Sequence, residues 1–297
     1  MRHTQDLIRK IIEYNPLQTS YLKQILLFLT NEERIELDEY IRYCCSIGKG
    51  IDYLAKSYYQ FLKDTLKEQL YFKRNHNYRY SKLSDVKENV YDQGDYMNMY
   101  MYSLAVSSFL WQQHVLIRRF YERVLPNDKK GKYLEIGPGH GYFFVKALKS
   151  TSYDYFYAID ISPISVKSTR EILKFRFGNT FNNYDIITGD FLTYTFKNKF
   201  DAIIMGEVLE HVETPDLMLK KIYNIANPGA HIFITTCINA PMIDHIYLFK
   251  TLEEVNELVN NSGFFIVERI CAPCLGESLE SSLIKTLPIN VAYQLSK

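Results

Sequence analysis

Lys132 to Tyr142 reads KYLEIGPGHGY, and this stretch decides how the chain folds. Its apolar beginning, residues 133–136, is typical of a short buried strand. Three glycines at alternate positions follow, and residues 143–148 have the apolar character of a helix that is just beginning. A glycine turn between a strand and a helix lets the backbone approach a ligand closely and points free N–H groups at it. The stretch therefore predicts a nucleotide-type cofactor site.

The spacing of the glycines distinguishes between two kinds of cofactor site. Gly137, Gly139 and Gly141 follow Glu135 in the pattern E-x-G-x-G-x-G, whereas a dinucleotide site prefers G-x-G-x-x-G and position 142 is Tyr. The stretch resembles motif I of the class I S-adenosylmethionine-dependent methyltransferases of the small-molecule type. An NAD-type oxidoreductase shares the glycine turn and remains an alternative.

The composition predicts a globular protein without a strongly charged partner. The 297 residues are 47% hydrophobic and 23% charged, with a net charge of +1. No basic block favours nucleic acid or an anionic membrane, and no apolar run reaches the roughly 18 residues that span a bilayer. The beginning of the sequence lacks the apolar core of a secretory signal, and five cysteines make no disulfide framework, so we expect a cytoplasmic location. Oligomeric state is not readable, and a homodimer is left open.

Cys271 and Cys274 form an isolated C-x-x-C pair. A zinc site would need a second pair or histidines at ligand spacing, and neither is recognisable in the sequence. We therefore expect no metal.

Two regions are expected along the chain. Residues 1–127 have helical periodicity, including a capping-box pattern at residues 30–33, and are interpreted as a helical lid or substrate-binding region. Residues 96–125 are expected to form one long helical segment with Tyr100, Trp111 and His114 on one side. Those three side chains either face the core or touch substrate from a helix that closes over the active site.

Residues 128–297 are interpreted as the S-adenosylmethionine-binding domain. Helical patterns alternate with seven predicted strands, which predicts an α/β fold: a doubly wound, mostly parallel sheet of the Rossmann-like methyltransferase type, with helices on both faces. Ligands bind such sheets at the carboxyl ends of the strands, where the strand order reverses. The strands are expected at residues 133–136, 155–159, 184–188, 200–205, 231–236, 264–270 and 289–295.

Four residues after the second and third strands are candidates for binding the nucleoside of the cofactor. Asp160 lies about 20 positions after Gly141, where a carboxylate accepts hydrogen bonds from both ribose hydroxyls. Ile161 follows it and is assigned to the same site. The resemblance implies that Asp190 lies at the adenine amine and Phe191 near the adenine ring. A helix cap at Asp160 and a surface turn at residues 189–191 are the structural alternatives.

Residues 206–213 read GEVLEHVE and resemble the E-x-L-E-H-V segment of small-molecule methyltransferases. The resemblance implies that Glu207 lies beside the amino acid part of the cofactor. On a helix, Glu207 and His211 would share one face, and a neutral histidine there could take a proton from the acceptor. The alternative is that His211 only packs or caps.

Polar side chains are dense in residues 235–247, after the fifth strand. Because polar groups are costly to bury without partners, substrate contact is expected for Asn239, and a catalytic role for Asp244 and His245. A loop whose polar groups satisfy one another is the alternative.

Together these motifs imply an S-adenosyl-L-methionine-dependent methyltransferase that releases S-adenosyl-L-homocysteine. A small metabolite or a natural-product peptide is the expected acceptor, methylated on N or O with His211 or His245 as base. Nucleic acid is not expected, because the N/D-P-P-Y/F tetrapeptide of DNA amino-methyltransferases does not follow the fourth strand. A methyltransferase-like binding module that has lost catalysis is a second alternative.

Overall fold

The computed structural model describes residues 2–178 and 181–297. In this part of the chain, helices precede the sheet, as the periodicity predicted. None of the described helices is long and apolar enough to cross a membrane. The helices are α1 (Arg2–Tyr14), α2 (Thr19–Phe28), α3 (Asn31–Ser46), α4 (Ile51–Asn75), α5 (Leu83–Val86), α6 (Gly94–Leu110) and α7 (Gln112–Val124), with short turns at Pro16–Gln18 and Lys87–Tyr91.

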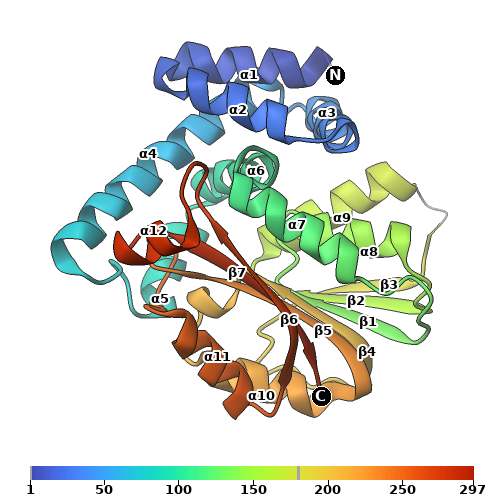
Figure 1. The fold of residues 1–297 in the computed structure, drawn as a ribbon. Coiled ribbons are helices and arrows are strands. Elements are labelled where there is room, and N and C mark those ends of the chain that lie inside the picture. Colours follow the sequence, from blue (N-terminus) through green and yellow to red (C-terminus); the bar gives the residue numbers. More distant parts are fainter. Residues whose placement is uncertain (1, 179–180) are drawn as a thin grey trace.

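The N-terminal helices bury their own apolar core. Leu7 of α1, Leu37 of α3, Tyr58 of α4 and Val106 of α6 are fully buried in one cluster, which Ile172 of a later helix also joins. The capping box at α3 is confirmed, because Thr30 Oγ1 accepts from Glu33 N and the Glu33 carboxylate accepts from Thr30 N. Figure 1 shows these helices stacked above one end of the sheet.

The expected long helix of residues 96–125 is interrupted at Trp111, which corrects the prediction. Trp111 has an extended backbone (φ −105°, ψ 124°) between α6 and α7. Its indole Nε1 donates to Tyr58 Oη at 3.1 Å, and its ring packs against Phe61. These contacts give a physical reason for the break. In a continuous helix, the Trp111 side chain would point in a different direction and would not reach Tyr58 and Phe61.

The second half of the chain forms a seven-stranded sheet with the strand order β3-β2-β1-β4-β5-β7-β6. Among the described strands, β7 runs antiparallel to β5 and β6, and the other neighbouring strands are parallel to each other. The order reverses between β1 and β4, which confirms the predicted fold. The strands are β1 (Lys132–Ile136), β2 (Tyr155–Asp160), β3 (Tyr184–Thr188), β4 (Phe200–Gly206), β5 (Ala226–Ile238), β6 (Phe265–Pro273) and β7 (Ile289–Ser296).

Helices cover both faces of this sheet (Figure 1). On one face, Phe120 of α7, Phe144 of α8 and Leu173 of α9 pack against side chains such as Phe233 of β5. The other face packs against α10 and α11, where Met218 lies in the same buried cluster as the inward side chains of β4 and β5. The bounds are α8 (Tyr142–Ser150), α9 (Pro163–Phe177), α10 (Pro215–Ile225), α11 (Leu252–Asn261) and α12 (Leu279–Ile284).

The fifth strand begins earlier than predicted. The sequence predicts this strand at residues 231–236, but β5 begins at Ala226. The register with β4 shifts between Phe200 and Ala202, so the extra residues are taken up as an irregularity in the ladder.

Candidate active site

The glycine loop after β1 has a backbone that favours glycine. The φ angles are +68° at Gly137, +54° at Gly139 and +79° at Gly141, in the left-handed region that side chains disfavour. A Cβ at Gly137 would lie 2.6 Å from Cγ2 of Val208. The Gly137 N–H donates to the Ile159 carbonyl at 2.8 Å, which ties the loop to the end of β2. The loop therefore keeps a close approach free of side chains.

Asp160, at the end of β2, turns its carboxylate toward this loop. Its Oδ1 accepts from Ser162 N at 2.8 Å, and its Oδ2 accepts from Gly139 N at 3.4 Å. Burial raises the pKa of Asp160 to about 6, and the two hydrogen bonds act in the opposite direction. The side-chain cap of α9 comes from Ser162, whose Oγ accepts from Ser165 N. Asp160 is thus not the side-chain cap of α9.

A cavity of about 330 Å³ lies beside Asp160. Ile161, Asp190 and Phe191 line it too, so the structure brings together the four residues predicted to hold the nucleoside. Asp190 Oδ1 accepts from Leu192 N at 2.8 Å, and the Phe191 ring is buried. An aromatic ring and carboxylates around one space suit a ribose and a base.

A second cavity, of about 650 Å³, meets the first at the carboxyl ends of β1 and β4. Gly137, Gly139, Glu207 and His211 line both cavities. Glu135 lines only the larger one and accepts from Tyr133 Oη at 2.8 Å. Burial raises the pKa of Glu135 to about 8.

Glu207 does not share a helix face with His211, and the structure corrects that expectation. Glu207 has a φ of +52° directly after β4, and only a 3-10 turn, η3 (Leu209–His211), follows it. The Glu207 N–H donates to Thr235 Oγ1 at 2.9 Å, and Oε2 accepts from Asn290 Nδ2 at 2.8 Å. Burial raises the pKa of Glu207. These contacts to β5 and β7 fix the turn in place of helical hydrogen bonds.

His211 and Asp244 meet across η3 and the loop after β5. His211 Nδ1 lies 2.9 Å from the Asp244 carbonyl oxygen and 3.6 Å from Asp244 Oδ2. An N–H at Nδ1 that donates to this carbonyl leaves Nε2 as the proton acceptor. The Asp244 carboxylate accepts from Tyr100 Oη at 2.7 Å and from Tyr91 Oη at 3.4 Å. The imidazole is therefore oriented from both the sheet domain and the helices.

His245 has a different environment from His211. Its Nδ1 lies 2.6 Å from the Ala240 carbonyl oxygen and 3.7 Å from Cys237 Sγ. Burial and, to a smaller extent, the neighbouring His211 lower the pKa of His245 to about 3. The ring is thus neutral and is a weak base.

Residues 110–271, more than half of the chain, match a family described as a methyltransferase domain. The chain belongs to this methyltransferase family. It is 27% identical over 197 residues to an uncharacterized protein of Methanocaldococcus jannaschii, a match that covers 62% of this chain and 66% of that protein. It is 31% identical over 84 residues to the mitochondrial ubiquinone biosynthesis O-methyltransferase of Rattus norvegicus, which covers 28% of this chain and 23% of that enzyme. The matches thus span less than two thirds of either relative.

Solved methyltransferases share the fold. Phosphoethanolamine N-methyltransferase 2 of Haemonchus contortus, solved with S-adenosyl-L-methionine, has a TM-score of 0.54 at 14% identity and covers 73% of this chain and 60% of that one. The mitomycin 7-O-methyltransferase MmcR has a TM-score of 0.53 at 13% identity, with 83% of this chain and 70% of that one covered. The sheet is therefore that of the class I S-adenosylmethionine-dependent methyltransferases.

Three predicted substrate residues line the larger cavity from the helices: Tyr100, Trp111 and His114. Burial lowers the pKa of His114 to about 4, and its Nδ1 lies 3.4 Å from Ser107 Oγ. Tyr100 is almost fully buried and also lines the smaller cavity. The structure thus supports both interpretations of this stripe, since these side chains pack into the helical core and also border the cavity.

Two predicted site residues line neither of these cavities. Gly141 is the N-cap of α8, so its part in the glycine loop is to begin that helix. Asn239 has a φ of +49°, and its side-chain Nδ2 donates to the Lys250 carbonyl at 3.0 Å. The amide of Asn239 is thus occupied in holding the loop after β5, as the alternative of a self-satisfied loop predicts.

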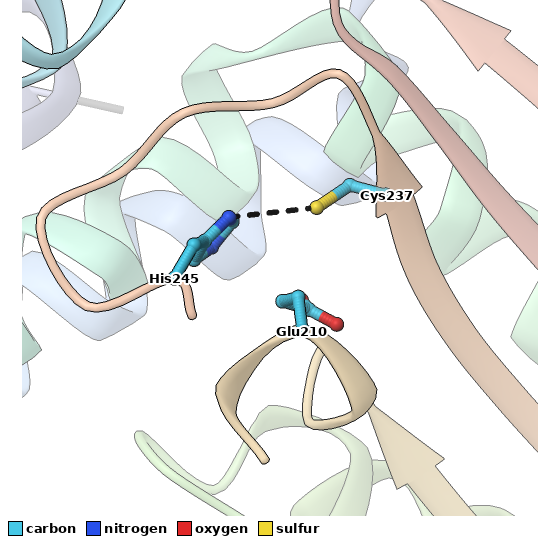
Figure 2. A group of neighbouring side chains, drawn as sticks. All are labelled: Glu210, Cys237 and His245. Atoms are coloured by element: carbon cyan, nitrogen blue, oxygen red, sulfur yellow. Dashed lines mark hydrogen bonds between the residues drawn. The ribbon is translucent and has the colours of Figure 1, made fainter. Parts of the chain in front are cut away.

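Sequence reasoning missed three residues of the site: Tyr91, Glu210 and Cys237. Tyr91 lies in the short turn Lys87–Tyr91, and its aromatic ring was the available signal. Glu210 and Cys237 are buried beside His245 (Figure 2), and the side chains of these three could hold a metal ion, as could those of His211, Asp244 and His245. The sequence does not show that Glu210, Cys237 and His245 lie at ligand distance from one another, because this depends on the pairing of β4 with β5.

Proposed function

We propose that the chain transfers a methyl group from S-adenosyl-L-methionine to a small metabolite or a natural-product peptide, on N or O. The observation that carries this proposal is the junction of two cavities at the strand-order reversal. One cavity is bordered by Asp160, Asp190 and Phe191, and the other is larger and mostly bordered by apolar side chains. Such a pair offers one space to a nucleoside and one to an acceptor.

Three features of the structure fit S-adenosyl-L-methionine as the donor. A Cβ at Gly137 would fill the turn, Asp160 offers a carboxylate for ribose hydroxyls, and Glu207 has a buried Oε1 without a hydrogen-bond partner. Asp190 and Phe191 would hold the adenine. Glu207, with Glu135 nearby, would accept from the ammonium group of the methionine part.

The chemistry requires little of the protein beyond alignment. When bound, the donor supplies an already activated methyl group for direct displacement from a sulfonium. The chain's residues then orient the acceptor, exclude water and remove a proton where the acceptor carries one. His211 is the favoured base because it lines both cavities, and its Nδ1 is held by the Asp244 carbonyl. His245 is less suited, because burial keeps its pKa at about 3.

The helical region before residue 128 would serve as the lid of the acceptor cavity. Phe61 of α4 and Tyr100 of α6 line that cavity, and Tyr100 is hydrogen-bonded to Asp244 of the sheet domain. Apolar and aromatic side chains on a lid favour an acceptor with a substantial apolar body. The five cysteines are all unpaired, which supports a cytoplasmic location.

The test is transfer of label from methyl-labelled S-adenosylmethionine to a library of amines, hydroxylated metabolites and peptides. Wild-type protein is expected to label at least one class. His211→Asn is expected to bind donor as the wild type does but to lose about 100-fold or more in rate, the range for loss of a general base. His76→Asn, at an exposed helix end, is the matched control.

Each outcome bears on one part of the proposal. If His211→Asn transfers label at the wild-type rate, His211 is not the base. If wild-type protein binds the donor but labels no acceptor, the binding-module alternative is favoured. Binding of NADH in place of S-adenosylmethionine would favour an oxidoreductase.

A further inference from the structure

The side chains of Glu210, Cys237 and His245 lie next to one another (Figure 2). All three line the larger cavity. Glu210 lies in η3, Cys237 near the end of β5, and His245 in the loop that follows β5. Their relative exposures are 0%, 1% and 7%, and one potential ligand atom from each lies within 4.8 Å of the others. Three buried groups that can each bind a metal therefore meet in one place.

Among the described residues, no lysine or arginine side chain pairs with the carboxyl groups of Glu207 and Glu210. The side chains of Glu207 and Glu210 face each other, and neither Oε1 has a hydrogen-bond donor. Two carboxylates cannot hydrogen-bond each other, so either a proton or a cation must lie between them. Among the described residues that line the cavity, Arg118 is the one lysine or arginine, and it pairs with Glu36.

Each histidine places one ring nitrogen at a backbone carbonyl. The Nδ1 atoms of His245 and His211 lie 2.6 and 2.9 Å from the carbonyl oxygens of Ala240 and Asp244, and the same Nδ1 of His245 lies 3.7 Å from Cys237 Sγ. An imidazole that donates from one nitrogen keeps a lone pair on the other for an ion. His211 Nε2 lies 4.0 Å from Glu210 Oε1, so it borders the same group.

We propose that Glu210, Cys237 and His245 bind one divalent transition-metal ion of the zinc class. A thiolate, an imidazole and a carboxylate are the ligands that zinc takes in proteins, and three protein ligands leave a fourth position open. Bound zinc would neutralise both the Glu210 carboxylate and the Cys237 thiolate. An ammonium group in the same place would bind the carboxylate but would form only a weak contact with the thiol. Because all three ligands line the larger cavity, the open position faces the space proposed for the acceptor.

A consequence for the acceptor rests on the proposed function. A thiol or hydroxyl that binds the ion is more acidic than in water, because the cation stabilises the anion. His211 would take its proton, the sulfur or oxygen would form the new bond to the methyl carbon, and the bonding electron pair of the broken C–S bond would remain on the donor sulfur. Thiols and hydroxyls would then be preferred over amines.

The experiment measures metal binding directly and does not depend on methyl transfer. Full-length protein, freed of metal with a chelator, is titrated with Co²⁺ and with Zn²⁺ while absorbance and bound metal are recorded. We expect one ion per chain, with a near-ultraviolet thiolate-to-cobalt charge-transfer band that Zn²⁺ abolishes. Cys237→Ser should remove the band. Glu210→Gln removes a ligand and should weaken metal binding by about 10- to 100-fold or more, because removal of a hydrogen-bonding partner of a ligand already costs that much.

Cys44→Ser is the matched control, because Cys44 is also fully buried but lies in the helical core. It should keep the band and the affinity. The proposal is overturned if wild-type protein binds no stoichiometric ion, or if Cys237→Ser keeps the band and the wild-type affinity. Retained binding in Cys237→Ser that is lost in Asp244→Asn would place the ion with His211 and Asp244 instead. Donor affinity, measured on the same samples, reports separately on the proposed function.

Discussion

At the scale of single residues, Asp160 carries most of the expected recognition of the donor. Its carboxylate ends β2, accepts weakly from the Gly139 N–H and borders the smaller cavity. Burial raises its pKa to about 6, so ionisation of this group falls within an accessible pH range. The position of this carboxylate and its pKa predict that the affinity for the donor depends on Asp160 and on pH.

Asp160→Asn is expected to weaken binding of S-adenosylmethionine about 10- to 100-fold, because hydrogen bonds to a charged acceptor contribute about 1.5–3 kcal/mol. The measurement is isothermal titration calorimetry at pH 7.5. Asp185→Asn, on the neighbouring strand and exposed, is the control and should bind as the wild type does. Equal affinities for all three proteins would contradict the role of Asp160.

Donor binding should also depend on pH through Asp160. The ribose donates to the ionised form, which predominates above the pKa of about 6 and is lost as the pH falls through it. The Kd should therefore rise up to tenfold for each pH unit below about 6, and Asp160→Asn should lack this rise. Glu135, whose pKa is about 8, and His211 also interact electrostatically with Asp160. The contribution of Asp160 is therefore the difference in the pH dependence of Kd between wild-type protein and Asp160→Asn.

Gly137→Ala should both destabilise the protein and impair donor binding. Its φ of +68° is strained for alanine, and the new Cβ would lie 2.6 Å from Val208 Cγ2. We expect a loss of about 1–3 kcal/mol in the free energy of unfolding, measured by urea denaturation. Gly94→Ala, at the beginning of α6 with open space around it, should be neutral or slightly stabilising. A stable Gly137→Ala protein with wild-type affinity would contradict the tight-turn role.

The glycines, Asp160 and Asp190 were predictable because each lies at the end of a predicted strand or within a few residues after it, where ligands bind such sheets. Glu210 and Cys237 were not predictable in this way. Their contact depends on β4 lying beside β5 and on the turn at Glu207, where tertiary hydrogen bonds replace the expected helix. A tertiary hydrogen bond also explains the outcome at Asn239, because its side-chain amide donates to the Lys250 carbonyl.

At the scale of elements, α6 is joined to the loop after β5 by one buried hydrogen bond. Tyr100 Oη donates to Asp244 Oδ1 at 2.7 Å. The periodicity of residues 96–110 predicted the helix, but it could not predict this partner 144 residues away. Nor could it predict the break at Trp111, which depends on the contact with Tyr58 of α4.

Tyr100→Phe should cost about 1–3 kcal/mol in the free energy of unfolding, because a buried carboxylate oxygen loses its donor. Hydrogen exchange should also become faster in the loop of residues 239–248. Tyr102→Phe, on the same helix with no described hydrogen bond at its hydroxyl, is the control and should change neither quantity. If both variants behave alike, α6 does not hold this loop.

At the scale of the whole molecule, Glu36 of α3 ties the helical region to the layer that covers the sheet. Its carboxylate accepts from Arg118 of α7 at 2.9 Å and from Lys146 of α8 at 2.6 Å. The Arg118 side chain is only 3% exposed, and Glu36 supplies the counter-charge for its guanidinium. The two regions are therefore expected to unfold together.

Glu36→Gln should lower the free energy of unfolding by about 2–3 kcal/mol, because a buried guanidinium loses its counter-charge. Urea denaturation followed by circular dichroism gives the measurement. Glu13→Gln removes an exposed pair with Lys10 and should leave stability unchanged. Two separate transitions in wild-type protein would contradict the expected coupling.

The central claim, that the crevice beside the glycine loop binds S-adenosylmethionine, is tested most directly by a crystal structure with S-adenosylhomocysteine at saturating concentration. We predict that the ribose hydroxyls lie on Asp160, that the adenine lies between Asp190 and Phe191, and that the amino acid part lies toward Glu207. A nucleoside bound elsewhere, or a crevice beside Gly139 that stays empty, would contradict it.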